Sequence, residues 1–296
     1  MVNTTLKGIG QEIFETRYAY PGETKWSERA KVIAKTVASA ENDEDKEKIE
    51  KLFYESIGSG DLIPGGRIIF GAGRSRGNHN LLNCYVIVPE DSVDSIGKTV
   101  QDMYKISCAG GGVGFNVSKI RPKGDDIGSV KSSAPGSVSV LKMINEVGEH
   151  VRAGKNRRTA LMGILNVTHP DLLEFLSVKL DQGQLNNFNI SVAITERFLE
   201  AVELGEDWYF TFNNKAYHSY HMIRNGKHNL SVIALDEADA LARAENFHKE
   251  DWKDTFECGG INDIKARDLW DKIWKNSVES GDPGIYNIDL ANKYTN

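Results

Sequence analysis

An alternation of strand-like and helix-like segments around one glycine-rich turn constrains the fold of this chain most strongly. The apolar run at residues 85–88 is typical of a short buried strand, and Pro89 ends it. Apolar residues at helical spacing follow at 96–106, and a glycine run at 110–114 breaks that helix before a second strand-like run at 115–120. This order of strand, helix, turn and strand predicts a parallel α/β unit.

The same alternation continues along the chain. Residues 137–151 have the spacing of a helix, 160–167 that of a buried strand, 185–194 that of another strand and 196–204 that of a helix. Between the two strands, His169 and Pro170 open a helix with proline in its first turn, so that His169 is expected to be a cap or turn residue. Repeated units of this kind imply a parallel sheet with helical crossovers.

Helical patterns precede the α/β region. Ser27 is predicted to cap a helix through about residue 40, and Asn42 or Asp43 to cap a second helix that ends at Gly58. Residues 63–73 are predicted to form a turn, a short apolar strand and a second turn. We therefore expect an N-terminal helical domain at residues 1–60 and an α/β domain at residues 61–296.

The region after residue 207 departs from the alternation. Asn225 and Gly226 between two apolar runs predict a hairpin insertion, and residues 235–246 predict an acidic, alanine-rich helix that faces solvent. The last helix, at 264–280, carries an apolar stripe whose Trp270, Trp274 and Val278 are expected in the core. Three histidines in the insertion and Cys258 match no closed zinc-ligand spacing, so no metal site is expected.

Composition excludes several classes of protein. The chain has 296 residues, of which 40% are hydrophobic and 26% charged, as in ordinary soluble domains. A net charge of -6 argues against a broad nucleic-acid surface, and no run of eighteen apolar residues suggests a membrane span. Three cysteines form no even disulfide framework, which predicts a reducing, cytoplasmic location.

Residue chemistry alone leaves the function of three features open. Cys84 is either a small core residue or a functional thiol. The glycine run fails the dinucleotide motif because Phe115 occupies the third glycine position, and so indicates a phosphate site only weakly. The basic loop at 152–158 is either a solvated loop or a site for nucleotide phosphates, which forked arginine donors suit.

Seven segments in one order resemble a known family. They are Asn83-Cys84, Asp91-Ser92, and residues 109–124, 154–165, 169–176, 185–195 and 280–292. Together they resemble the catalytic subunit of ribonucleotide reductase, most like the adenosylcobalamin-dependent class II type, from about residue 63 onward. The resemblance implies an α/β fold that is the first half of a ten-stranded α/β barrel, a five-stranded parallel half-barrel, after a small helical domain.

The resemblance also implies roles for individual residues. Cys84 would be a catalytic redox cysteine, the first of a pair, that delivers reducing equivalents to the ribose. Substrate contacts would come from Gly66, Asn83, Cys84, Gly111 and Gly112. A deoxynucleotide effector would bind Asp91, Ser92, Val93, Arg121, Gly128 and Ser129. A specificity loop would couple the two sites through Arg152, Gly154, Lys155, Asn156, Arg157 and Arg158.

The radical cysteine of the family, in an Asn-Pro-Cys-Gly-Glu run, is not in this sequence. We therefore expect the N-terminal part of a reductase, a split half or a fragment, inactive without a C-terminal part that carries that run. The expected ligands and partners are adenosylcobalamin, a ribonucleotide, a deoxynucleotide effector and a thioredoxin-like dithiol. An unpaired sheet edge would favour oligomerisation.

Two alternatives remain open at this stage. The first is a catalytically dead nucleotide-binding or scaffolding module that associates with a reductase. The second is a fragment of a class I reductase, which uses a separate subunit as its radical source.

Overall fold

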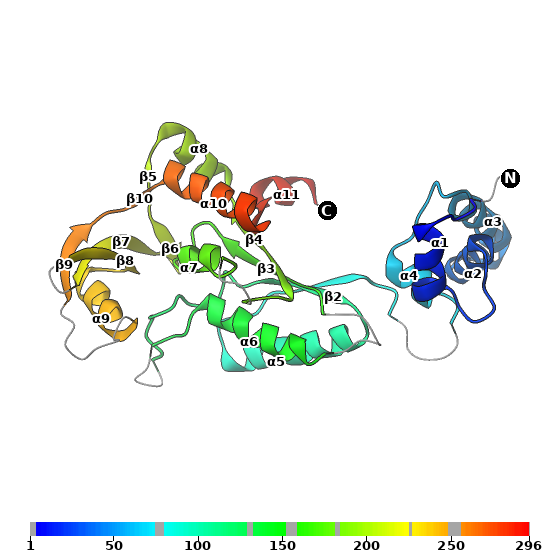
Figure 1. Cartoon of the computed structure of the whole chain (residues 1–296), viewed down its shortest axis with the longest axis horizontal. Helices are drawn as coiled ribbons and strands as arrows, with labels where there is room; N and C mark the ends of the chain where they lie inside the picture. Colours follow the sequence, from blue (N-terminus) through cyan, green and yellow to red (C-terminus); the bar gives the residue numbers. More distant parts are fainter. Residues whose placement is uncertain are drawn as a thin grey trace. The chain divides into compact units, whose positions relative to one another are not determined.

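The chain folds into two compact units (Figure 1). The computed structural model describes residues 4–74, 80–128, 133–151, 159–180, 184–224, 227–247 and 256–295. One unit contains the described residues up to 85 together with 105–112, and the other contains the remaining described residues.

The first unit is helical, as predicted. It contains α1 (Ile9–Ile13), the π-helical turn η1 (Phe14–Tyr18), α2 (Trp26–Ala38), α3 (Asp43–Ser59) and α4 (Gly66–Gly71). Seven residues of these elements form its apolar core: Phe14, Trp26, Ala30, Ile33, Ile57, Ile69 and Ala72. The Trp26 indole also donates a hydrogen bond of 2.8 Å to the Ile57 carbonyl, which joins α2 to α3.

Of the two predicted helix starts, one is wrong and one is confirmed. Lys25, not Ser27, is the N-cap of α2, and the Glu28 carboxylate accepts from the backbone N–H of Thr24 at 2.8 Å and of Lys25 at 3.0 Å. The cap predicted at Ser27 is therefore wrong, because Glu28 satisfies the free amides one turn earlier. Asn42 is the N-cap of α3, as predicted.

Residues 66–71 form helix α4, so the strand predicted within 63–73 is wrong. The Gly65 carbonyl accepts from the backbone N–H of Ile68 at 2.9 Å and of Ile69 at 3.1 Å, which starts the helix. At the C-terminal end of α4, the buried Arg29 side chain donates to the Ile69 carbonyl at 2.7 Å and to the Ala72 carbonyl. Side-chain hydrogen bonds from α2 thus satisfy the last carbonyls of a short helix.

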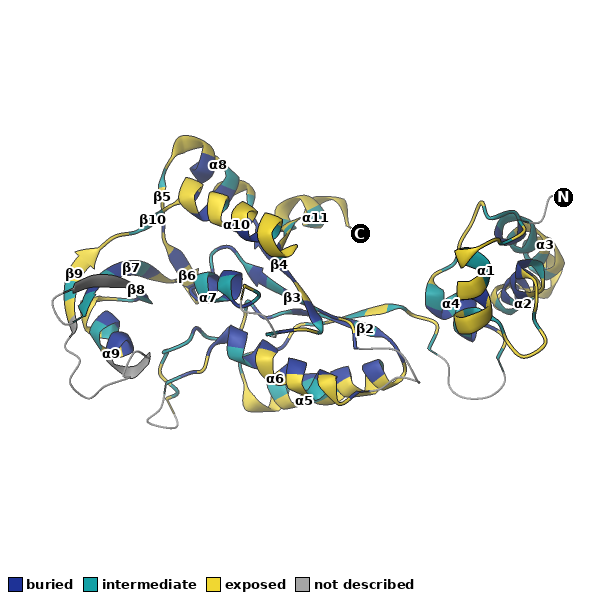
Figure 2. Ribbon diagram, in the orientation of Figure 1, coloured by how far each residue is buried: buried dark blue, intermediate teal, exposed yellow. Residues whose placement is uncertain are grey.

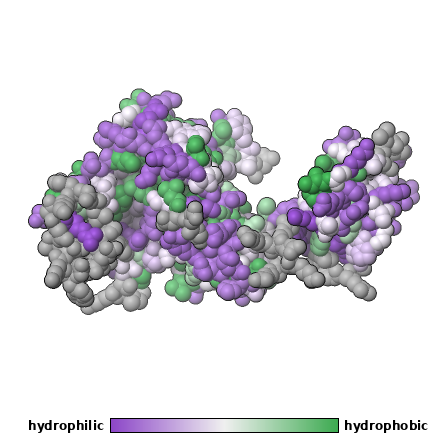
Figure 3. All heavy atoms as spheres, viewed as in Figure 1, coloured by the Kyte–Doolittle hydropathy of each residue, from purple (hydrophilic) through white to green (hydrophobic). Residues whose placement is uncertain are grey.

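An apolar pocket of about 200 Å³ opens in the helical unit. Its walls include Leu6, Ile13, Phe14, Trp26 and Ile63. Figure 3 shows a hydrophobic area on this unit within a mostly hydrophilic surface. The residues predicted to contact substrate are not among those that line this pocket.

A five-stranded parallel sheet is the centre of the second unit, and this prediction is confirmed. The strand order is β1 (Cys84–Ile87), β2 (Gly112–Asn116), β3 (Leu161–Asn166), β4 (Phe188–Ile194) and β11 (Gly284–Asn287). In register, Val113 pairs with Leu161, Leu161 with Phe188, and Gly284 with Ser191. The strands β3 and β4 are largely buried, which explains their nearly continuous apolar sequences (Figure 2).

Helices cover both faces of this sheet (Figure 1). On one side lie α5 (Val93–Cys108) and α6 (Ser137–Glu149), and on the other lie α8 (Glu196–Leu204) and α10 (Ala266–Ser280). Two shorter helices, α7 (Leu172–Ser177) and α11 (Ile288–Tyr294), follow β3 and β11 along the chain. Among the described helices, none is both long and apolar enough to cross a membrane.

Strand β2 begins earlier than predicted, at Gly112 inside the glycine run. The backbone N–H of Gly112 donates to the Asn83 carbonyl at 2.8 Å, and that of Val113 donates to the Ala160 carbonyl at 3.1 Å. These ladder bonds fix an extended backbone although glycine has a low strand propensity. The turn is therefore limited to the residues before Gly112.

The predicted hairpin insertion is present. Strands β7 (Lys215–Arg224) and β8 (Lys227–Ala234) pair antiparallel, and β9 (Phe256–Ile261) pairs with the other edge of β7. The predicted turn residues, Asn225 and Gly226, lie outside the described residues. Strand β6 (Phe210–Phe212) also pairs antiparallel with β7, and β5 (Asp207–Trp208) pairs with β10 (Ile264–Lys265) in a separate two-stranded sheet.

Two burial predictions for the C-terminal region are wrong. Helix α9 (Glu237–Phe247) does not simply face solvent, because Ala240 and Ala244 are buried in a cluster with residues of β7 and β8. On α10, Trp274 is 48% exposed and Val278 is 81% exposed, so the predicted apolar stripe is not all core. Only the part of that stripe near Leu269 and Ile273 is buried.

Candidate functional site

Three segments that are distant in the sequence meet around Asn83 in the first unit. Its side-chain Oδ1 accepts from the backbone N–H of Arg67 at 3.0 Å, and its carbonyl accepts from the N–H of Gly112 at 2.8 Å. A methyl group added at Gly65 would lie 2.3 Å from the Asn83 amide nitrogen. The start of α4, the start of β1 and the start of β2 are thus in direct contact.

Glycine is required where these segments approach one another. A Cβ at Gly111 would lie 2.7 Å from the Ile106 side chain and 2.9 Å from the Tyr85 ring. Gly110 has a φ of +79° and its added Cβ would lie 2.2 Å from the Arg67 guanidinium. Both glycines are buried, and the side chains of Arg67, Ile106 and Tyr85 fill the space beside them.

The five predicted substrate residues lie in this one neighbourhood. Gly66 stands between the two residues that contact Asn83, Gly112 is hydrogen-bonded to Asn83, and Gly111 is next in the chain. Cys84 follows Asn83 directly at the first position of β1, and its thiol is exposed. An exposed thiol is accessible to a ligand, whereas a buried structural cysteine is inert.

Sequence reasoning missed Arg67, which is central to this cluster. Its side chain is 9% exposed, donates through Nη1 to the Ala109 carbonyl at 3.3 Å, and lies 5.7 Å from the centre of the Phe70 ring. The guanidinium thereby holds the glycine turn against α4. A lone arginine in the apolar segment 63–73 was the available signal.

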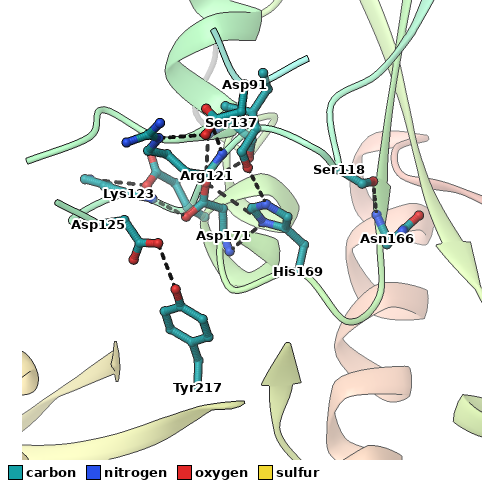
Figure 4. Close-up of polar contacts among 12 residues, drawn as sticks. Asp91, Ser118, Arg121, Lys123, Asp125, Ser137, Asn166, His169, Asp171 and Tyr217 are labelled. Carbon is teal, nitrogen blue, oxygen red and sulfur yellow. Dashed lines mark hydrogen bonds and ion pairs between the residues drawn. The ribbon is translucent and has the colours of Figure 1, made fainter. Parts of the chain in front are cut away.

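The predicted effector residues lie in the second unit, where Asp91 and Arg121 form an ion pair (Figure 4). Arg121 Nε lies 2.7 Å from Asp91 Oδ2, and the Arg121 backbone N–H donates to Asp91 Oδ1 at 3.3 Å. Both side chains are about one-third exposed, at 32% and 27%. The pair thus joins the end of β1 to the loop after β2 and leaves polar atoms open to solvent.

The structure places the other predicted effector residues in different ways. Ser92 is exposed and its hydroxyl accepts from the Ser95 N–H at 3.2 Å, at the start of α5. Val93 and Gly128 are exposed. Ser129 and the specificity loop lie outside the described residues, the loop comprising Arg152, Gly154, Lys155, Asn156, Arg157 and Arg158.

A buried polar cluster supports the loop that carries Arg121 (Figure 4). The Asp171 carboxylate accepts from the Lys123 N–H at 2.9 Å and from both the N–H and the hydroxyl of Ser137, at 2.7 and 2.9 Å. Asp171 and Ser137 are almost fully buried. Hydrogen bonds to every side of this carboxylate offset the cost of burying its charge.

His169 completes the cluster as a neutral side chain. Its Nδ1 accepts from the Asp171 N–H at 3.1 Å, so Nε2 carries the proton and donates to the Ile120 carbonyl at 2.8 Å. Burial lowers the pKa of His169, against the opposing effect of the Asp171 carboxylate. The predicted turn role is confirmed by these bonds, and both ring nitrogens are occupied.

Comparison with known proteins decides the family. The description "Ribonucleotide reductase, barrel domain" matches residues 82–296, and "Ribonucleotide reductase, all-alpha domain" matches residues 5–77. The chain belongs to the ribonucleotide reductase large-subunit family. Its helical unit and parallel sheet correspond to these two domains in the same order.

Several curated reductases are similar to the chain. A vitamin B12-dependent ribonucleoside-diphosphate reductase of Thermoplasma acidophilum is 31% identical over 242 residues, which cover 81% of this chain and 26% of that reductase. One of Mycobacterium tuberculosis is 31% identical over 72% of this chain and 25% of its own length. A ribonucleoside-diphosphate reductase subunit alpha of Bacillus subtilis is 24% identical over 91% of this chain. The chain therefore spans about a quarter of the B12-dependent reductases that it matches.

Two described histidines are bonded within the chain. His169 is buried with both nitrogens bonded, and His218 is bonded through Nδ1 to Asp263 at 2.7 Å. His169 is therefore not placed as an open ligand.

Proposed function

We propose that this chain supplies the first half of the catalytic site of a ribonucleotide reductase. The observation that supports the proposal most is the exposed Cys84 thiol beside Asn83, whose carbonyl accepts from the partly exposed Gly112. A sugar could approach the Gly112 backbone closely because glycine carries no side chain. The names of the similar reductases suggest ribonucleoside diphosphates as substrates.

Cys84 would act as a reductant in this reaction. Replacing the 2'-hydroxyl of a ribose by hydrogen needs two electrons and two protons, and the hydroxyl leaves as water. Two thiols supply the two electrons and the two protons and end as one disulfide. An external dithiol then reduces this disulfide. The second thiol, like the radical cysteine, would come from polypeptide outside these 296 residues. A bound adenosylcobalamin supplies the radical in class II chemistry.

The Asp91–Arg121 pair would form part of the deoxynucleotide effector site. Arginine donates to phosphate in a bidentate manner, and the exposed backbone of Ser92 and Val93 lies at the start of α5, where N–H groups attract anions. Effector phosphates would thus compete with Asp91 for Arg121. The 152–158 loop would carry the signal to the substrate side.

A reconstitution experiment tests the reductant role. The chain is mixed with a polypeptide that carries the Asn-Pro-Cys-Gly-Glu run, adenosylcobalamin, a ribonucleoside diphosphate and a dithiol, and deoxynucleotide is measured. We expect Cys84→Ser to abolish turnover while effector binding is unchanged. Cys108→Ser is the matched control, since Cys108 is also exposed, and it should leave turnover unchanged.

Each outcome separates the candidate functions. Turnover that survives Cys84→Ser contradicts the reductant role and supports a nucleotide-binding or scaffolding module. Turnover that requires an added radical-generating subunit in place of the cobalamin supports a class I reductase. Loss of turnover in both cysteine variants would indicate a folding defect and contradict the assignment to Cys84 alone.

A further inference from the structure

The hairpin insertion, which comprises strands β6 to β9 and helix α9, binds the loop that follows β2 through one carboxylate. Asp125 lies on this loop, four residues after Arg121, and both of its carboxylate oxygens are bound by insertion residues. The Tyr217 hydroxyl on β7 donates to Oδ2 at 2.8 Å, and Arg243 Nη2 on α9 lies 2.7 Å from Oδ1 (Figure 4 shows the tyrosine contact). The residues that meet here are separated by about a hundred positions in the chain.

Arg243 binds three different acceptors, and its bond to Asp125 together with that of Tyr217 is called the clamp. Arg243 is 5% exposed, and its other nitrogens are bound by the Asp239 carboxylate, at 2.8 Å, and by the Lys123 carbonyl. Its guanidinium also lies 5.7 Å from the centre of the Tyr217 ring. A buried arginine whose three nitrogens each bind an acceptor fixes the direction of each partner, because the fork is planar.

Tyr217 is equally fixed. It is fully buried, and burial, followed by the hydrogen bond to Asp125, raises the pKa of its hydroxyl, so that the group stays protonated as a donor. The opposite side of the same loop is bound by Asp171 through the Lys123 N–H. The loop is therefore hydrogen-bonded both to Asp171 and to Tyr217 and Arg243 of the insertion.

These contacts control the position of Arg121. The Arg121 Nη1 donates to the Asp126 carbonyl at 3.0 Å, one residue after the clamped Asp125. The same stretch closes the base of the loop, where the Gly124 N–H donates to the Ala134 carbonyl at 2.9 Å and the Ala134 N–H donates to the Asp125 carbonyl at 2.8 Å. A shift of Asp125 would thus move both the loop base and the Arg121 guanidinium.

We propose that Tyr217 and Arg243 are positioning residues, through which the insertion sets the affinity of the nucleotide effector site. This inference rests on the proposed effector role of Arg121 and Asp91, and it adds an element to which no binding role has been given. Neither positioning residue touches the nucleotide. Both act through Asp125.

The test uses Tyr217→Phe and Arg243→Lys in the 296-residue chain, with dATP and dTTP as probes in titration calorimetry. Tyr217→Phe keeps the buried ring and removes the bond to Asp125, and lysine keeps the charge of Arg243 but not its fork. We expect the Kd for both nucleotides to rise about five-fold or more, within the usual range of coupling between sites. We also expect the ratio of the two Kd values to stay constant, because Arg121 is proposed to bind the phosphates, which both nucleotides carry.

Tyr220→Phe is the matched control, because Tyr220 is also buried on β7 but packs against Met222 and Val232. It should leave both Kd values unchanged. A second readout needs no nucleotide: amide hydrogen exchange at Gly124 and Ala134 should become faster in Tyr217→Phe, while the sheet amide of Val167 exchanges as before.

The outcomes distinguish this inference from the proposed function. Nucleotide binding that is equal in Tyr217→Phe, Arg243→Lys and wild type overturns the positioning role and leaves the effector site intact. If exchange at Gly124 and Ala134 is faster in Tyr217→Phe but the wild-type chain binds neither nucleotide, the effector site is overturned. The contact of the insertion with Asp125 is then still supported. Unchanged exchange in both variants overturns the clamp itself.

Discussion

At the scale of single residues, Gly110 joins backbone conformation to the shape of the candidate substrate surface. Its φ of +79° is unfavourable for any residue with a Cβ, and an added methyl group would lie within 2.4 Å of three atoms of the Arg67 guanidinium. We expect Gly110→Ala to lower the free energy of unfolding by about 1–3 kcal/mol, from backbone strain and displacement of Arg67. Urea unfolding monitored by circular dichroism measures the change.

Gly97→Ala is the control for this prediction. Gly97 lies in the middle of α5, and an added Cβ there would meet nothing within 4 Å among the described residues. Alanine should therefore stabilise the helix by up to about 1 kcal/mol. Equal stability of the two alanine variants would contradict the role given to the contact with Arg67.

His169 predicts how stability depends on pH. Burial holds the pKa of the folded state below the ordinary value of 6.5, and the nearby Asp171 and Asp125 carboxylates oppose this only in part. Between the folded and the unfolded pKa, His169 therefore binds a proton in the unfolded chain and not in the folded chain. Stability is fully present above about pH 6.5 and is lost as the pH falls towards the folded pKa, by up to about 1.4 kcal/mol per pH unit.

His169→Gln tests this dependence, since the amide can still donate to the Ile120 carbonyl. Unfolding free energies at several pH values between 7 and 5 should give a slope that is smaller than the wild-type slope by up to one proton. His150→Gln, at the exposed C-terminal end of α6, is the control. A variant of His169 with the wild-type slope would show that another group is responsible.

At the scale of elements, Arg29 links α2 to both the end of α4 and Glu23. It is 1% exposed, donates to the Ile69 and Ala72 carbonyls, and lies 3.2 Å from the Glu23 carboxylate. We expect Arg29→Met to cost about 3 kcal/mol or more in unfolding free energy, because it leaves buried acceptors without donors. Chemical denaturation followed by circular dichroism measures the change.

Lys46→Met is the comparison for Arg29. Lys46 pairs with Asp43 at 3.0 Å on the exposed face of α3, and such pairs contribute about 0.5 kcal/mol or less. Similar losses in the two variants would mean that the buried bonds of Arg29 contribute no more than a surface ion pair.

Sequence periodicity predicted the parallel strands and their crossover helices because each element buries a continuous apolar face in β3, β4 or α6. It failed for α4 and α9, whose states depend on distant partners. Arg29 stabilises the last turn of α4 from forty positions away, and the alanines of α9 are buried only because β7 and β8 lie against them. Local propensity carries no information on such contacts.

The residues of the candidate site were likewise predicted only in part. The resemblance supplied residues 83–84 and 111–112 as a set, and the structure brings that set together. Arg67, Tyr217 and Arg243 were not predicted, because their partners lie 42 to 118 positions away and their own neighbours resemble ordinary helix or strand. Their roles depend on packing, which only the folded chain defines.

At the scale of the whole molecule, the order of the central sheet determines where association is expected. β1 and β11 are the outer strands, so each has one edge without a strand partner among the described residues. Val86 on β1 is 78% exposed, and Val88 directly after this strand is also exposed. An apolar edge strand of this kind pairs readily with another chain.

We therefore expect the chain to self-associate with increasing concentration, and Val86→Lys to reduce the association. A charged side chain on an edge strand disfavours edge-to-edge pairing, because pairing would bury the charge. Val278→Lys is the matched control, since Val278 is similarly exposed at 81% but lies on helix α10 and not on a strand. Sedimentation velocity at several concentrations measures the mass of both variants and of wild type. If Val278→Lys lowers the mass as much as Val86→Lys does, association proceeds through exposed apolar side chains in general and not through the edge of β1.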